Sequence, residues 1–359
     1  MNDGDATAGP PPPIANPDLF DHAQAELEFL DSFKTGRLPH AWLISGPLGV
    51  GKATLAYRIA RFMLTQQNFV ENSAGLFGNS IHKSNPTSLA VDITDPICRR
   101  IISGGHADFL CIQRSIDEKT GKKRREITVD EVRGVNSFFS KTPAEGGWRV
   151  IVIDSADEMN LNAANAVLKV LEEPPKRALL LLISNNPAKL LPTIRSRCRR
   201  LYLHSLPSNT ISDFFRKYDN QITPEELKQL VELADGSIGR ALELSENGGL
   251  DIYREVDIIL ATLPELDIPR LHQLGDTLNR QKSSKVLEHT FDIINRWLGK
   301  IIKDLAINRS SSIDPWIEVW ENTGILLNQT KGLNLDPKQA ILNTFIAIRN
   351  SSNHQKYKL

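Results

Sequence analysis

The sequence predicts an α/β protein, in which a doubly wound parallel sheet of five strands is followed by helices alone. Short apolar runs alternate with amphipathic helical stretches between residues 18 and 205, which is typical of βαβ units. After residue 206 no β-type run appears, and helical periodicity continues through the rest of the chain. A glycine-rich segment also lies between the first apolar run and the next helix, an order typical of a phosphate-binding unit.

The expected elements follow from these runs. The strands are the apolar runs 41–45, 108–113, 148–154, 178–184 and 200–204. The helices between them are 21–36, 55–64, 96–103, 129–139 and 162–173. Gly36 suits the position after a helix C-terminus, and Pro174 ends the last of these helices because proline cannot continue one. The run 148–154 is continuous in Val and Ile, as a parallel strand buried on both faces requires.

These patterns divide the 359 residues into a tail and three domains. Residues 1–17 contain five prolines and almost no large apolar side chains, so we expect a disordered tail. The α/β domain is expected at 18–205, a small helical domain at 206–248 and a larger helical domain at 249–359. Within the first of these, residues 66–107 form an insertion that contains the helix at 96–103.

Composition excludes several classes of protein. Lys plus Arg and Asp plus Glu are both 43, so the net charge is zero and any contact with nucleic acid must be local. Three scattered cysteines with no Cys-x-x-Cys pair exclude a disulfide framework and a ribbon-type zinc site. No secretion leader and no apolar run near the ~20 residues of a membrane span are present. We therefore expect a cytoplasmic protein without membrane contact.

Residues 46–52 fit the Gly-x4-Gly-Lys pattern of a phosphate-binding loop. Its glycines let backbone amides converge on phosphate oxygens, and Lys52 neutralises phosphate charge. The next position should hold Mg²⁺ through Ser or Thr but is Ala53, and Thr54 is turned by about 100° around the helix. ATP or ADP binding and a glycine turn without ligand both stay open. The glycines are Gly46, Gly49 and Gly51.

Asp154 ends the third strand at the edge where open α/β sheets bind ligands. A carboxylate there can hold the water shell of Mg²⁺. The next residue, Ser155, has no charge with which to orient or deprotonate water. Asp157 and Glu158 come later and are expected to face elsewhere. The interpretations are a weakened Walker B site, which we prefer because of Lys52, and a strand-end cap.

Three segments together resemble bacterial clamp-loader subunits, which are AAA+ proteins of the replicative DNA polymerase III holoenzyme. They are Arg37–Lys52, Ile153–Pro175, which contains AANAVLKVLEEPP, and Leu191–Cys198, which contains SRC. The resemblance covers residues 18–245 by motif, and the remainder by length and helical character. It implies an AAA+ P-loop domain, a lid at 206–248 and an oligomerisation collar at 249–359.

The resemblance also implies roles for single residues. In that family SRC carries an arginine finger, so Arg197 would reach the ATP site of a neighbouring subunit and stabilise phosphate charge there. The alternative is a solvated basic turn. Asn185, beside Ser184, falls at the sensor 1 position, and Arg240 falls in a motif that resembles sensor 2. An ordinary surface arginine is the alternative for Arg240.

Two departures from the family pattern indicate a type of subunit. Its active ATPases carry Thr or Ser where this chain has Ala53, and Glu where it has Ser155, whereas Arg197 is intact. This pattern resembles the delta prime type, which implies a heteropentamer with gamma/tau and delta subunits, a sliding clamp, and primer–template DNA reached through the complex. The alternatives are an active gamma/tau-like ATPase and, less consistent with the long helical C-terminus, an unrelated phosphate-loop kinase.

Many relatives carry four cysteines between the first helix and the second strand. Here that region has only Cys98, with His82 and His106, which do not make a tetrahedral site. We predict no zinc and an insertion held by packing. The basic loop 119–125 is interpreted as solvated in preference to DNA-binding, because its charges are mixed.

Overall fold

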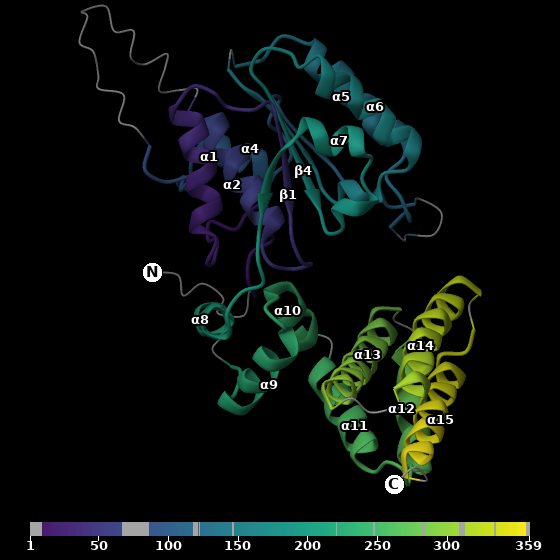
Figure 1. Cartoon of the computed structure of the whole chain (residues 1–359). Coiled ribbons are helices and arrows are strands. Elements are labelled where there is room, and N and C mark those ends of the chain that lie inside the picture. Colours follow the sequence, from purple (N-terminus) through teal and green to yellow (C-terminus); the bar gives the residue numbers. More distant parts are fainter. Residues whose placement is uncertain are drawn as a thin grey trace, which may run out of the picture. The chain divides into compact units, whose positions relative to one another are not determined.

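The computed structural model describes residues 9–66, 86–117, 121, 123–145, 147–219, 221–246, 248–281, 284–308, 313–333 and 335–356. The chain forms two compact units (Figure 1). The first contains the residues up to Leu227 together with Val231–Arg240, and the second contains Lys228–Leu230 and the chain from Ala241 onward. The expected lid segment, 206–248, is thus divided between the two units, and its standing as a separate domain stays a prediction.

The first unit is built on five parallel strands in the spatial order β2-β3-β4-β1-β5, which confirms the expected fold class. The strands are β1 (Ala41–Ser45), β2 (Phe109–Ile112), β3 (Arg149–Ile153), β4 (Ala178–Ser184) and β5 (Arg199–Tyr202). Every residue of β1, β3 and β4 is buried, because helices cover both faces of the sheet. Ser45 at the end of β1 lies opposite Ser184 of β4 and Tyr202 of β5.

Two apolar cores lie on opposite faces of this sheet. One face packs against α1 (Ala23–Lys34), α2 (Lys52–Thr65) and α4 (Pro96–Ile102). The other packs against α5 (Val129–Ser140), α6 (Leu161–Glu172) and α7 (Pro192–Arg197). The sequence analysis did not predict α7, whose six residues are too few to show helical periodicity. Since α7 precedes β5, its C-terminal residue lies near the start of that strand.

The N-terminal segment makes specific contacts where the composition predicts disorder. Residues 1–8 lie outside the described residues. The buried guanidinium of Arg61 on α2 donates to the carbonyl oxygens of Ile14, at 2.5 Å, and Asn16, at 2.7 Å. Arg58 donates to the carbonyl of Pro17. The prediction is therefore wrong for residues 14–17, because buried guanidinium groups require acceptors and this segment supplies them.

The helices after the sheet begin with α8 in the first unit and end with the bundle of the second. They are α8 (Ser208–Tyr218), α9 (Pro224–Ala234), α10 (Ile238–Glu246), α11 (Gly249–Ala261), α12 (Ile268–Gln281), α13 (Ser284–Ile307), α14 (Asp314–Leu333) and α15 (Pro337–Lys356). Thr223 and Glu226 form the capping box that begins α9. In the bundle, Trp316 is buried against Trp297, whereas Trp320 is half exposed.

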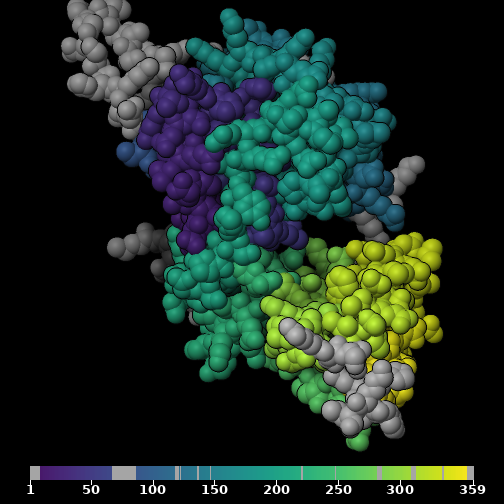
Figure 2. Space-filling view, in the orientation of Figure 1, coloured from purple at the N-terminus to yellow at the C-terminus, as the bar shows by residue number. Residues whose placement is uncertain are grey.

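Figure 2 shows the surface of the chain, coloured from purple at the N-terminal end to yellow at the C-terminal end. Within the described part of the chain, no helix has the length and apolar character needed to span a bilayer.

We expect Leu181→Ala to lower the free energy of unfolding of the sheet unit by about 2–5 kcal/mol, because the change leaves a cavity in the core that packs against α1, α2 and α4. Leu181 lies within β4 and is fully buried, whereas Leu161, the matched control, is 63% exposed. Hydrogen exchange of the β3 and β4 amides measures the effect in this unit alone. Equal protection in the two variants would contradict the described sheet.

Candidate functional site

The glycine-rich loop leaves β1 at Gly46 and enters α2 at Lys52. Gly46, Gly49 and Gly51 all have positive φ angles, of +148°, +76° and +108°, which side chains rarely tolerate. A Cβ atom at Gly46 would lie 2.2 Å from the carbonyl oxygen of Leu203. The loop therefore has the tight backbone path that the sequence pattern predicts.

The turn before α10 and its first residues pack directly on this loop. The Ser237 hydroxyl donates to the carbonyl of Leu48 at 2.8 Å, and the Gly239 amide donates to the carbonyl of Gly49 at 2.9 Å. A Cβ at Gly239 would lie only 2.8 Å from the Gly49 Cα, so both glycines are required for the contact. The Arg240 amide in turn donates to the Ser237 hydroxyl at 3.1 Å. The structure thus places the backbone of the segment before Arg240 against the glycine-rich loop, and the sensor role of Arg240 stays a prediction.

Lys52 is buried at the base of the loop. Its Nζ donates to the carbonyl of Gly46 at 2.8 Å and to that of Pro47. Burial lowers the pKa of Lys52 to about 8, while the charges of Asp157 and Asp154 oppose the shift. The ammonium group is therefore held by the loop's own carbonyl oxygens and balanced by two carboxylates.

The two positions after Lys52 provide no accessible oxygen ligand for a metal ion. Ala53 has no oxygen ligand and packs against the core formed with α1 and α2. Thr54 is buried within α2. The structure therefore supports the expectation that Thr54 does not simply replace the missing hydroxyl.

Asp154 follows β3, and its amide extends the strand pairing by donating to the carbonyl of Ile112 at 2.8 Å. Burial raises the pKa of the Asp154 carboxyl, and the positive charges of Lys123 and Lys52 oppose that rise. Lys123 belongs to the basic loop, in which residues 119, 120 and 122 lie outside the described residues. Part of that loop therefore acts electrostatically on the candidate site.

The expectation that Asp157 faces away from the candidate site is wrong. Its carboxylate accepts hydrogen bonds from the amides of Asn185, at 3.0 Å, and Asn186, at 3.1 Å, just beyond β4. Ser155, with φ +63°, makes the left-handed turn between Asp154 and Asp157. No sequence pattern predicts a left-handed residue at Ser155. The one available signal for the role of Asp157 was its position three residues after Asp154.

Glu158 pairs with Arg114 at 2.7 Å, so its carboxylate has a partner outside the loop. The carboxyl edge of the sheet therefore gathers the loop, Lys52, Asp154, Asp157 and Asn185.

Arg197 lies at the other edge of the sheet. It ends α7, two residues before Arg199, which pairs with Trp42 near the start of β1, whereas the phosphate loop follows the end of β1. At about 3.3 Å per residue, the length of β1 separates the two by about 15 Å. The Arg197 Nη2 lies 3.0 Å from Oε1 of Glu172, and Nη1 donates to the carbonyl of Thr193 at 3.1 Å.

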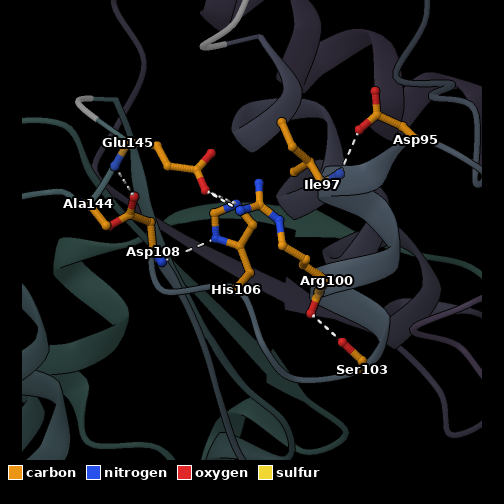
Figure 3. Close-up of polar contacts among 8 residues, drawn as sticks. All are labelled: Asp95, Ile97, Arg100, Ser103, His106, Asp108, Ala144 and Glu145. Atoms are coloured by element: carbon orange, nitrogen blue, oxygen red, sulfur yellow. Dashed lines mark hydrogen bonds and ion pairs between the residues drawn. The ribbon is translucent and has the colours of Figure 1, made fainter.

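A polar cluster fixes the end of the insertion where α4 meets β2 (Figure 3). The His106 Nδ1 accepts from the Asp108 amide at 3.1 Å, so the neutral ring carries its proton on Nε2. That atom lies 3.9 Å from a carboxylate oxygen of Glu145, which pairs with Arg100 at 2.7 Å. Asp108 accepts from the amides of Ala144 and Glu145. Burial lowers the pKa of His106.

The prediction that the chain holds no zinc stays a prediction, because the structure describes only part of the insertion. Among the residues that the structure describes, no three His, Cys, Asp or Glu side chains are grouped so as to hold a metal ion. Cys98 is buried, and His82 lies outside the described residues.

We expect Asp157→Asn to lower the pKa of Lys52 below about 8, because the substitution removes the stronger of the two carboxylate interactions that favour the ammonium. A pH titration of ¹³C-labelled lysine side chains measures this pKa, with Lys52→Arg assigning the signal. The control is Asp213→Asn, an exposed aspartate of α8 that pairs with Arg216. An unchanged or higher pKa in Asp157→Asn would refute the described coupling.

Comparison with known proteins identifies the family. The family model described as "DNA polymerase III, delta subunit" matches residues 22–207, more than half of the chain. A DNA polymerase III subunit delta' from Pseudomonas aeruginosa is 34% identical over 210 residues, which cover 58% of this chain and 56% of that protein. A DNA polymerase III subunit gamma from Buchnera aphidicola subsp. Schizaphis graminum is 31% identical over 221 residues, covering 60% and 53%.

Among solved structures, a DNA polymerase III gamma subunit-related protein from Thermotoga maritima aligns with 90% of this chain and 99% of its own, at 17% identity and a TM-score of 0.46. The matched segment spans little more than half the length of the two relatives above. Because the family model covers more than half of the sequence, the chain belongs to the DNA polymerase III delta-subunit family.

Proposed function

We propose that this protein is a delta prime-like subunit of the DNA polymerase III clamp loader in the cytoplasm. In this role it hydrolyses no ATP itself and supplies Arg197 as an arginine finger to a neighbouring ATPase subunit. The neighbour's hydrolysis then accompanies loading of the sliding clamp onto primed DNA during replication. Membership of the family and the relatives named delta' and gamma support a place in the polymerase III complex.

The position of Arg197 is the observation that carries the proposal. A finger acts by placing positive charge on the phosphate that is being transferred. Arg197 lies at the amino edge of the sheet, whereas the phosphate loop lies at the carboxyl edge. Its side chain is nevertheless 36% exposed. If such an arginine contacts a nucleotide, its distance from its own loop favours a nucleotide bound by another subunit.

The composition of the chain's own site supports a subunit that does not hydrolyse ATP. The three glycines and Lys52 fit a bound phosphate, and we assign sensor roles to Asn185 and Arg240 from the family resemblance. Neither Ala53 nor Ser155 supplies the metal ligand or base that hydrolysis requires. Lys52 is already held by the carbonyl of Gly46. We therefore infer that ATP or ADP binds weakly and is not turned over.

The helical unit supports assembly with other subunits. On α14, the side chains of Trp320, Ile325 and Leu333 are at least 48% exposed, although such residues are normally buried. We infer that this helix contributes to a collar that joins gamma/tau and delta subunits in a heteropentamer. Contacts with the clamp and with primer–template DNA would be made through that complex.

An active gamma/tau-like ATPase is the second candidate, favoured by the gamma relative at 31% identity. It requires Thr54 or a water molecule to replace the missing ligand, and Thr54 is buried in α2. Steady hydrolysis by the purified chain, lost in Lys52→Ala, would distinguish this candidate.

We expect Arg197→Ala to slow hydrolysis at the neighbouring site by about 10³-fold or more, because the finger's charge on the phosphate is lost. The measurement is single-turnover ATP hydrolysis by a reconstituted complex with clamp and primed DNA. Gel filtration of the complex verifies that assembly is intact.

Arg200→Ala is the matched control for this change, since Arg200 is an exposed arginine of the adjacent strand β5. A complex that contains the Arg200→Ala variant should hydrolyse ATP at the rate of the unchanged complex. If Arg197→Ala did so too, the finger role would be wrong.

A further inference from the structure

We propose that Glu172 holds Arg197 in a self-paired position and gives it up to the phosphate of the neighbouring subunit. Glu172 is thus a reversible, autoinhibitory partner of the finger. The inference rests on the proposed function of Arg197 and adds to it the residue that controls when the finger is available.

The C-terminal ends of two helices bring this pair together. Glu172 is the last residue of α6 and Arg197 the last residue of α7, and these helices pack against each other. The end of α6 is anchored to the sheet, because His40 donates from Nε2 to the carbonyl of Leu171 at 3.1 Å. The backbone beside Glu172 is therefore fixed next to β1, and the carboxylate does not depend on a loose loop for its position.

The contacts occupy the nitrogen atoms that a finger needs. Nη2 of Arg197 lies 3.0 Å from a carboxylate oxygen of Glu172, and Nη1 donates to the carbonyl of Thr193 at 3.1 Å. Both terminal nitrogens are thus turned toward their own chain. A phosphate oxygen could approach them in the same geometry, since arginine binds carboxylate and phosphate alike.

Arg197 cannot pair with Glu172 and stabilise a phosphate at the same time, because both interactions use its positive charge. A carboxylate at 3.0 Å neutralises the guanidinium, whereas a finger works through its positive charge. Were Glu172 to remain in contact, its negative charge would also be brought toward the neighbour's triphosphate and be repelled. The pair must therefore open when the finger engages.

The exposure of the pair makes this exchange reversible. The side chains of Arg197 and Glu172 are 36% and 51% exposed, and ion pairs so open to water are weak. A triphosphate carries several charges and can outcompete a single carboxylate. Glu173, the next residue, is also exposed but forms no ion pair with any described residue, so it offers a matched control.

The test is ATP hydrolysis by the reconstituted complex at limiting ATP. We expect Glu172→Gln to raise the rate about two- to fivefold, because it removes the competing charge with little change in shape. Glu173→Gln should leave the rate unchanged. The gain should shrink as added salt screens the pair in the unchanged chain. In the double variant Glu172→Gln/Arg197→Ala, the rate should equal that of Arg197→Ala alone.

The outcomes separate this inference from the proposed function. If Arg197→Ala slows hydrolysis but Glu172→Gln matches the unchanged complex, the finger role stands and the holding role is overturned. A slower rate in Glu172→Gln would also overturn it, since Glu172 would then orient the finger. If Arg197→Ala has no effect, the proposed function itself fails, and this inference with it.

Discussion

The parallel pairing of β1 with β4 and β5 is the constraint on which both functional regions depend. Its register sets Ser45 against Ser184 and Tyr202, so the phosphate loop and Asn185 leave the sheet at the same edge. The same register sets Arg199 against Trp42 and thereby places Arg197 at the opposite edge. One strand thus separates the glycine-rich loop from the exposed Arg197.

At the carboxyl edge, carboxylates compensate the charge of the buried Lys52. A buried ammonium is costly unless it is paired, and Lys52 is balanced by Asp157 and Asp154 and bound by loop carbonyls. Asp157 also holds the amides that follow β4. This network ties the glycine-rich loop, Lys52 and the segment after β4 together at one edge of the sheet.

The sequence revealed those features that repeat or follow simple spacing. The five strands, the loop and the turn at Gly36 are confirmed, because apolar runs and positive-φ glycines are local signals. The role of Asp157 was missed because it depends on a left-handed turn at Ser155. The contacts of Ile14 were missed because composition does not show that Arg61 is buried and needs acceptors. The pairing of Arg197 with Glu172 joins two helix ends distant in sequence, which no local pattern records.

In the proposed role, the chain serves a neighbour's site while its own site does not hydrolyse ATP. The most direct test incubates the purified chain with labelled ATP and Mg²⁺, and measures bound nucleotide and released phosphate in the same sample. We expect weak binding and no phosphate release above the background. Sustained release that the Lys52→Ala variant loses would contradict the proposed role.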